Sequence, residues 1–86
     1  MKAFFHKNFE KKFNKLRVSD KKKARERLYL FSKDPFDTVL ENHPLKGRYA
    51  DYRSINITGD IRAVYKFLNE NECIFVAVDT HSNLYF

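Results

Sequence analysis

Two histidines, a carboxylate and a tyrosine fall in predicted loops and turns beside strands, where functional side chains concentrate. His43 precedes a group of cations, and His81 follows an apolar strand directly, with Tyr85 four residues later. Asp60 lies in a turn signal between two further strands. If these strands form a meander, the loops that carry the four residues can meet at one side of the sheet.

Such a set of side chains suits metal-independent cleavage of RNA. A general base takes the proton of a 2′-hydroxyl, that oxygen attacks the adjacent phosphorus, and an acid protonates the leaving 5′-oxygen. Histidine suits both proton transfers because its pKa lies near neutral pH. Arginine or lysine would stabilise the extra negative charge of the pentacoordinate phosphate. Three such cations follow His43 in the chain: Lys46, Arg48 and Arg53.

Other classes of site have no signature in the sequence. It contains neither a glycine-rich phosphate loop nor a nucleophile elbow. The three histidines lack i, i+3 or i, i+4 spacing, so we expect no metal site and no cofactor. The single cysteine, Cys73, excludes an internal disulfide and CxxC-based sites. We interpret His6 as a surface or structural residue.

Charge divides the 86-residue chain into two unlike parts. Residues 1–33 carry 12 Lys/Arg and 3 Asp/Glu, a net charge of +9, whereas residues 34–86 have a net charge of −3. A cationic surface favours a polyanion such as nucleic acid, although a merely solvated helix surface has the same composition. The length fits a single domain, residues 1–86. With no apolar run long enough for a signal peptide or membrane span, we expect a cytoplasmic protein without membrane contact.

The first third of the chain has the pattern of one strand and two helices. Residues 2–6 alternate as in a short strand, and a helix is expected over residues 7–17. Ser19 or Asp20 is expected to cap a second helix over residues 21–33. Each helix has an apolar face: Phe9, Phe13 and Leu16 in the first, and Ala24, Leu28 and Phe31 in the second. Helices this short need a surface to pack on.

The rest of the chain has the pattern of a sheet. A connector over residues 36–45, with a helical turn near Leu40, precedes strands expected over residues 52–57, 61–68 and 73–79. The last strand is apolar throughout, so we expect a central strand covered on both faces, followed by a loop over residues 80–83. The order β-α-α-β-β-β predicts an α+β fold in which an antiparallel sheet packs against two N-terminal helices.

The segments that carry the candidate chemistry resemble the RelE/ParE superfamily of bacterial toxins, and most closely its YafQ branch. The resemblance rests on five segments in this order: His43-Pro44-Leu45-Lys46-Gly47, Tyr52-Arg53, Asp60, Val64-Tyr65 and Thr80-His81-Ser82-Asn83-Leu84-Tyr85. It is strongest over residues 41–85, whereas the amino-terminal half agrees only in length, helical pattern and basic charge.

This resemblance implies a microbial RNase fold and the activity of a ribosome-dependent mRNA endonuclease, which cuts the codon in the ribosomal A site without a metal. It also implies a cognate antitoxin that covers the active groove. The expected partners are therefore the antitoxin, the ribosome with its rRNA, and mRNA. The toxin itself would be a monomer within a toxin–antitoxin hetero-oligomer.

The matched positions imply a role for each residue. His81 would be the general acid, His43 an acid, a base or a phosphate contact, and Asp60 would orient the catalytic groups. Tyr85 would stack on a base or take part in proton transfer, whereas Tyr65 is expected in the core. RNA would be bound by residues near the site and by the basic helices: Lys46, Arg48, Arg53, Asn56, Arg62, Lys11, Lys12, Lys22 and Lys23.

Two positions depart from the branch. Asn56 stands where a second catalytic histidine is usual, and asparagine cannot transfer a proton near neutral pH. Ile61 replaces the usual tryptophan after Asp60. Two alternatives therefore stay open: a ParE-like inhibitor of DNA gyrase, and a basic RNA-binding domain of the same fold that cleaves weakly. The presence of His81 together with Tyr85 favours the endonuclease.

Overall fold

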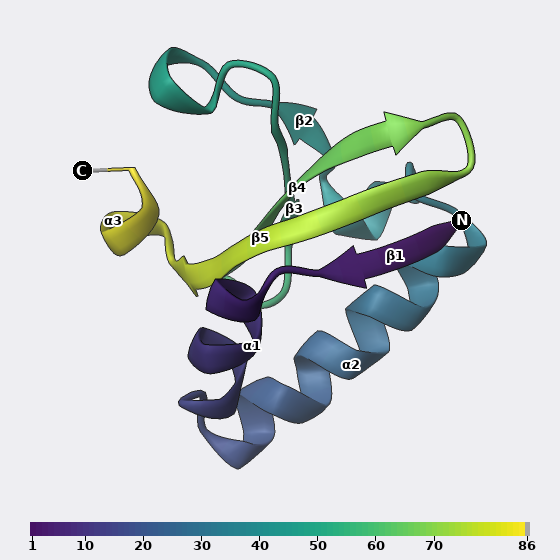
Figure 1. Ribbon diagram of the computed structural model, residues 1–86. Coiled ribbons are helices and arrows are strands. Elements are labelled where there is room, and N and C mark those ends of the chain that lie inside the picture. Colours follow the sequence, from purple (N-terminus) through teal and green to yellow (C-terminus); the bar gives the residue numbers. More distant parts are fainter. Residues whose placement is uncertain (86) are drawn as a thin grey trace.

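The computed structural model describes residues 1–85, with Phe86 outside the described part, as helices packed on a five-stranded sheet (Figure 1). The helices and strands are β1 (Lys2–Phe5), α1 (Lys7–Asn14), α2 (Val18–Lys33), β2 (His43–Pro44), β3 (Arg53–Asn56), β4 (Ile61–Asn69), β5 (Glu72–Thr80) and α3 (His81–Leu84). Two 3-10 turns, η1 (Thr38–Leu40) and η2 (Gly47–Tyr49), lie on either side of β2. The predicted α+β fold class is confirmed.

The strand order in the sheet is β1-β5-β4-β3-β2. Strands β3, β4 and β5 form the expected antiparallel meander, and β2 adds to its edge. However, β1 pairs with β5 in parallel, so the sheet is mixed rather than antiparallel throughout. No tight turn joins β1 to β5, and the local sequence therefore does not fix their relative direction.

The main core lies between the sheet and the two N-terminal helices, as the apolar helix faces predict. Phe31 of α2 packs edge-on against Tyr65 and Phe75, with ring centroids 4.8 and 5.2 Å away. Phe9 of α1 reaches the same Phe75 ring at 5.8 Å. Tyr65 is fully buried, which confirms it as part of the core. Burial raises the pKa of Tyr65 and raises the pKa of the Cys73 thiol to about 11.

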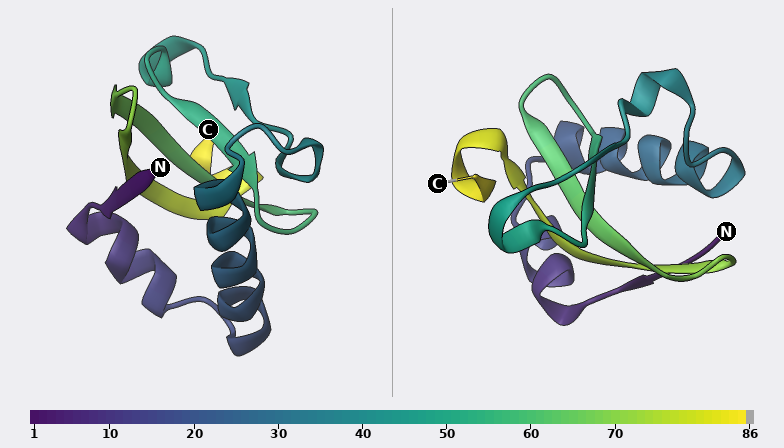
Figure 2. Two further views of the ribbon diagram at one scale, coloured as in Figure 1. Left: turned by 90° about the vertical axis from the view of Figure 1, so that its right-hand side faces the viewer. Right: turned by 90° about the horizontal axis from the view of Figure 1, so that it is seen from above.

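The opposite face of the sheet is covered at one end only. Ser54 of β3 and Val64 of β4 are cross-strand partners, and both are fully buried on this face. The cover is the C-terminal helix α3, whose Leu84 is buried. Figure 2 shows α3 close to the segment that contains η2. This end of the sheet holds the candidate site.

Several expected boundaries were wrong. Helix α1 ends at Asn14 rather than near Arg17, and α2 begins at Val18, before either expected cap. Its N-cap is Arg17, whose Nε donates to the Asp20 carboxylate at 3.1 Å. Asp20 is thus an acid in the first turn, where it complements the helix dipole.

The end of the sheet also differs from expectation. The predicted loop over residues 80–83 is mostly the helix α3, whereas the helical turn near Leu40 is confirmed as η1. Ile74 and Val76 are only half-buried, so β5 is fully covered on one face and not on both. Within residues 1–85, no helix is long and apolar enough to cross a membrane.

Candidate active site

A polar pocket of about 250 Å³ opens on the outer face of the sheet, where the ends of several elements converge. Its position follows from the topology. Asn56 and Arg62 are cross-strand partners in β3 and β4, β2 runs beside β3, and the end of β5 delivers α3 to the same place. Six residues line the pocket: Glu41, His43, Asn56, Arg62, His81 and Tyr85.

The His43 ring is oriented by a backbone carbonyl. Its Nδ1 lies 2.8 Å from the carbonyl oxygen of Glu41. A carbonyl oxygen only accepts hydrogen bonds, so Nδ1 carries the proton in this arrangement. The other ring nitrogen, Nε2, is then the one that accepts a proton when the ring is neutral and donates one when it is charged.

His81 occupies the first turn of α3. The Thr80 hydroxyl caps this helix by accepting from the Asn83 N–H at 3.2 Å, and the His81 N–H donates to the Asp60 carbonyl at 2.9 Å. The imidazole packs edge-on against the Tyr85 ring, with centroids 4.8 Å apart. These contacts fix both the backbone and one side of the ring.

Tyr85 is tied to the sheet beneath it. Its hydroxyl donates to the buried Ser54 Oγ at 3.0 Å. The ring therefore stands at a defined place, where it lines both this pocket and a neighbouring pocket of about 570 Å³. Lys46 and Arg48 also line the neighbouring pocket, which places two predicted RNA-binding cations next to the site.

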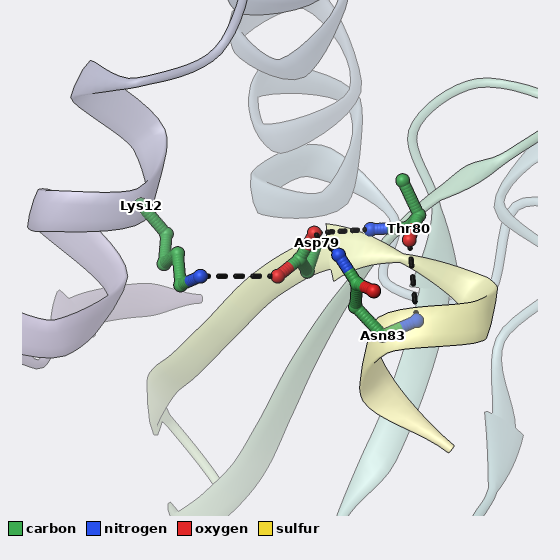
Figure 3. A network of polar contacts seen from close by, with 4 residues as sticks. All are labelled: Lys12, Asp79, Thr80 and Asn83. Carbon is green, nitrogen blue, oxygen red and sulfur yellow. Dashed lines mark hydrogen bonds and ion pairs between the residues drawn. The ribbon is translucent and has the colours of Figure 1, made fainter. Parts of the chain in front are cut away.

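Asp79, near the end of β5, bonds to residues of both α1 and α3, and sequence reasoning did not single it out (Figure 3). One carboxylate oxygen accepts from the Thr80 N–H at 2.7 Å and from the Asn83 side chain at 3.0 Å, while the other lies 3.3 Å from Lys12 Nζ. Partial burial would raise the pKa of Asp79, but these bonds and the lysine outweigh it and lower the pKa. An acid at the junction of an apolar strand and a helix cap was the available signal.

Glu41 is the second residue that sequence reasoning missed. Its carboxylate accepts a hydrogen bond from the Asn56 side-chain amide, across the wall of the pocket. Its backbone is left-handed, with φ of 46°, at the end of η1. The available signal was its position two residues before His43.

Arg62 supplies the cation that lines the pocket directly. Its Nη1 donates to the carbonyls of Thr58 at 2.9 Å and Gly59 at 3.1 Å, both in the turn before β4. Because these bonds hold the guanidinium at the turn, its charge stands at a fixed point in the pocket wall.

Other predicted site residues lie elsewhere. The exposed Asp60 side chain is not part of the pocket lining, and Asp60 reaches the site through its backbone bond to His81; its catalytic role stays a prediction. Arg53 lies away from the pocket, where its Nε donates to Asn42 at 2.8 Å and its guanidinium covers Phe36.

The four predicted docking lysines differ in their surroundings. Lys12 pairs with Asp79, and Lys23 lies 3.7 Å from Glu26 within α2. Lys11 and Lys22 are exposed. Within residues 1–85, no group of three His, Cys, Asp or Glu side chains is placed to hold a metal ion. The absence of a metal from the reaction stays a prediction.

Comparison with known proteins points to one family. The family model for YafQ, the bacterial toxin of a type II toxin–antitoxin system, matches residues 1–86. No curated protein matches the chain in sequence.

Several solved structures have the same fold as this chain. YafQ from E. coli matches with a TM-score of 0.80 at 24% identity, covering 98% of this chain and 97% of that chain. A copper-bound mutant toxin from Helicobacter pylori matches with a TM-score of 0.69 at 29% identity, covering 99% of each chain. The E. coli DinJ–YafQ complex matches with a TM-score of 0.69 at 23% identity, covering 98% of this chain and 97% of that chain.

Proposed function

The chain belongs to the YafQ family of toxins of type II toxin–antitoxin systems, and we propose that it is a ribosome-dependent mRNA endonuclease that needs no metal. The observation that supports this activity is the pocket in which two histidines, His43 and His81, stand beside the guanidinium of Arg62. Histidines supply proton transfer near neutral pH, and the arginine supplies charge where a phosphate would sit.

With a volume of about 250 Å³, the pocket would take one scissile phosphate with its flanking sugar. His81 would give its proton to the leaving 5′-oxygen, and Arg62 would stabilise the negative charge of the pentacoordinate phosphate. The Tyr85 ring, held upright by Ser54, would stack on a base beside the cut. Lys46 and Arg48, in the adjoining pocket, would bind the backbone of the same RNA strand.

We further propose that a cognate antitoxin neutralises the toxin in the cytoplasm. The E. coli homologue was solved as the DinJ–YafQ toxin–antitoxin complex, and its chain has the fold described above. The net charge of +6 on this chain favours an acidic or amphipathic segment as the partner.

Removal of the imidazole at position 81 tests the activity. We expect His81→Ala to lower mRNA cleavage by about 10²- to 10⁴-fold, because a general acid contributes this much. His43→Ala should lower it as well. The matched control is His6→Asn, which keeps the side-chain cap of α1 at a histidine outside the pocket. The measurement is primer extension on a reporter mRNA after induced expression in bacteria.

Loss of neither growth arrest nor RNA phenotype in the pocket variants would contradict the endonuclease activity. If wild type and both pocket variants arrest growth equally and produce no new mRNA ends, the chain is not this endonuclease. Supercoiling by purified DNA gyrase then decides whether it is a gyrase inhibitor. Affinity for ribosomes without cleavage, falling steeply with salt, would instead identify an RNA-binding domain.

A further inference from the structure

The pocket holds few groups that could accept the proton of the 2′-hydroxyl. Arg62 and the Asn56 amide nitrogen only donate, and the Tyr85 hydroxyl is engaged with Ser54. His43, His81 and the Glu41 carboxylate are left. If His81 is the acid, the base is either an imidazole or a carboxylate.

The Glu41 carboxylate is held at the wall of the pocket. It accepts a hydrogen bond from the Asn56 amide, which fixes its orientation from the neighbouring strand β3. An ionised carboxylate has about four lone-pair sites, so this bond leaves capacity for a substrate hydroxyl. Glu41 is exposed to solvent, so a substrate in the pocket can reach it.

The backbone of Glu41 is equally constrained. Left-handed φ in a residue other than glycine costs on the order of 1 to 2 kcal/mol, and such strain concentrates at functional sites. Here the N–H donates to the Thr38 carbonyl at 3.2 Å, and the carbonyl oxygen is 2.8 Å from His43 Nδ1. One residue thus orients a histidine through its main chain and presents a carboxylate to the same pocket.

Charged and titratable groups surround this carboxylate from several elements. Arg62 of β4, His43 of β2, and His81 and Tyr85 at the C-terminal helix share its pocket. Lys23 and Arg27 of α2 line a further pocket of about 360 Å³ of which Glu41 is also part. The carboxylate therefore stands between the proposed catalytic groups and a cationic stretch of α2.

We infer that Glu41 is the general base of the reaction and that Asn56 positions it. The Glu41 carboxylate takes the proton of the 2′-hydroxyl as the 2′-oxygen bonds to phosphorus. The bond from phosphorus to the 5′-oxygen breaks, and that oxygen receives a proton from the His81 imidazolium. The products are a 2′,3′-cyclic phosphate and a 5′-hydroxyl, and solvent then restores both protonation states. This inference rests on the proposed endonuclease activity.

The test is Glu41→Gln, which keeps the shape of the side chain and removes its basicity. We expect cleavage of ribosome-bound mRNA by the purified toxin to fall by about 10²- to 10⁴-fold, with ribosome binding and thermal stability unchanged. The matched control is Glu70→Gln, at an exposed acid in the turn between β4 and β5, which should cleave as wild type does.

A pH profile separates this role from a structural one. With a carboxylate base, wild-type cleavage persists below pH 6, where an imidazole base is largely protonated. Asn56→His in the Glu41→Gln background should restore part of the rate, with its acidic limb moved up to about pH 6.5. If Glu41 were structural and His43 the base, wild-type cleavage would fall below pH 6 and Asn56→His would restore no activity to Glu41→Gln.

Comparing wild type with Glu41→Gln distinguishes failure of the proposed role of Glu41 from failure of the proposed endonuclease activity. If wild type cleaves and Glu41→Gln cleaves within about threefold of it, the general base is another group, and the endonuclease proposal stands. If wild type cuts no ribosome-bound mRNA, the proposed function fails and the role of Glu41 fails with it.

Discussion

At the scale of single residues, Tyr85 contributes its ring to the pocket while its hydroxyl serves the fold. The hydroxyl donates to Ser54 Oγ, and Ser54 is fully buried. We expect Tyr85→Phe to retain cleavage and to lower the free energy of unfolding by about 1 to 2 kcal/mol, because a buried hydroxyl loses its partner. Urea-induced unfolding together with the mRNA cleavage assay measures both quantities.

A second substitution controls for this interpretation. Ser54→Ala combined with Tyr85→Phe removes both partners, so the pair should cost less than the sum of the two single changes. If Tyr85→Phe instead loses cleavage by about 100-fold at unchanged stability, the hydroxyl takes part in proton transfer.

The sequence predicted most of the pocket but not its carboxylate. His43, Asn56, Arg62, His81 and Tyr85 were all singled out, and the structure brings them together. Asp60 was expected as the carboxylate because it lies in the turn before β4, yet Glu41 lines the pocket. The position of Glu41 depends on a left-handed residue at the end of η1, a conformation that side-chain patterns predict poorly outside glycine.

At the scale of elements, α3 depends on contacts outside itself. A helix of four residues has no stability of its own. It is held by the Thr80 cap, by the bond from His81 to the Asp60 carbonyl, and by Asp79, which links it to α1 through Lys12. Because those contacts come from distant parts of the chain, local pattern predicted a loop here.

Contacts between distant parts of the chain also explain the other differences between prediction and structure. The meander β3-β4-β5 was predicted because polar turns join strands of alternating pattern. Strands β1 and β2 lie at the two edges of the sheet, and no tight turn joins β1 to β5 or β2 to β3, so local pattern does not specify these pairings. Helix α2 begins after Arg17, which makes no side-chain capping bond, so capping preferences do not locate this start.

Asp79 should make the stability of this junction depend on pH. Its pKa is lower in the folded protein than in the unfolded chain, so it stabilises the fold above the unfolded pKa of about 3.9. This contribution is lost as the pH falls through the folded pKa. We therefore expect Asp79→Asn to cost about 1 kcal/mol at pH 7, and the difference from wild type to vanish at low pH.

Urea-induced unfolding of both proteins from pH 7 down to pH 2.5 measures this dependence. Lys12→Gln is the control, since it removes only the ion pair and should account for part of the cost. A difference between wild type and Asp79→Asn that stays constant over this range would show that the carboxylate charge does not hold α3.

At the scale of the whole molecule, charge and chemistry are separated along the chain. The net +9 of residues 1–33 lies mostly on α1 and α2, which pack on one face of the sheet (Figure 1). The pocket opens on the other face. The pocket draws its cation, Arg62, from the half of the chain with net negative charge. Binding to the ribosome and cutting of mRNA should therefore respond to different substitutions.

The exposed lysines of the helices should carry most of the electrostatic binding. Lys11 and Lys22 are exposed, and within residues 1–85 neither takes part in a salt bridge, whereas Lys12 and Lys23 each have a carboxylate nearby. A lysine already paired with a carboxylate neutralises a phosphate less completely, so fewer counterions leave the RNA. We expect Lys11→Gln with Lys22→Gln to reduce the slope of log K against log salt by about 1 to 2, and Lys12→Gln with Lys23→Gln to reduce it less.

Ribosome binding at several salt concentrations measures the slopes, with His81→Ala as a variant that should lose cleavage and keep the wild-type slope. Equal slopes for the two double variants would mean that these ion pairs open when the toxin docks, and an unchanged slope in both would place the docking surface outside α1 and α2.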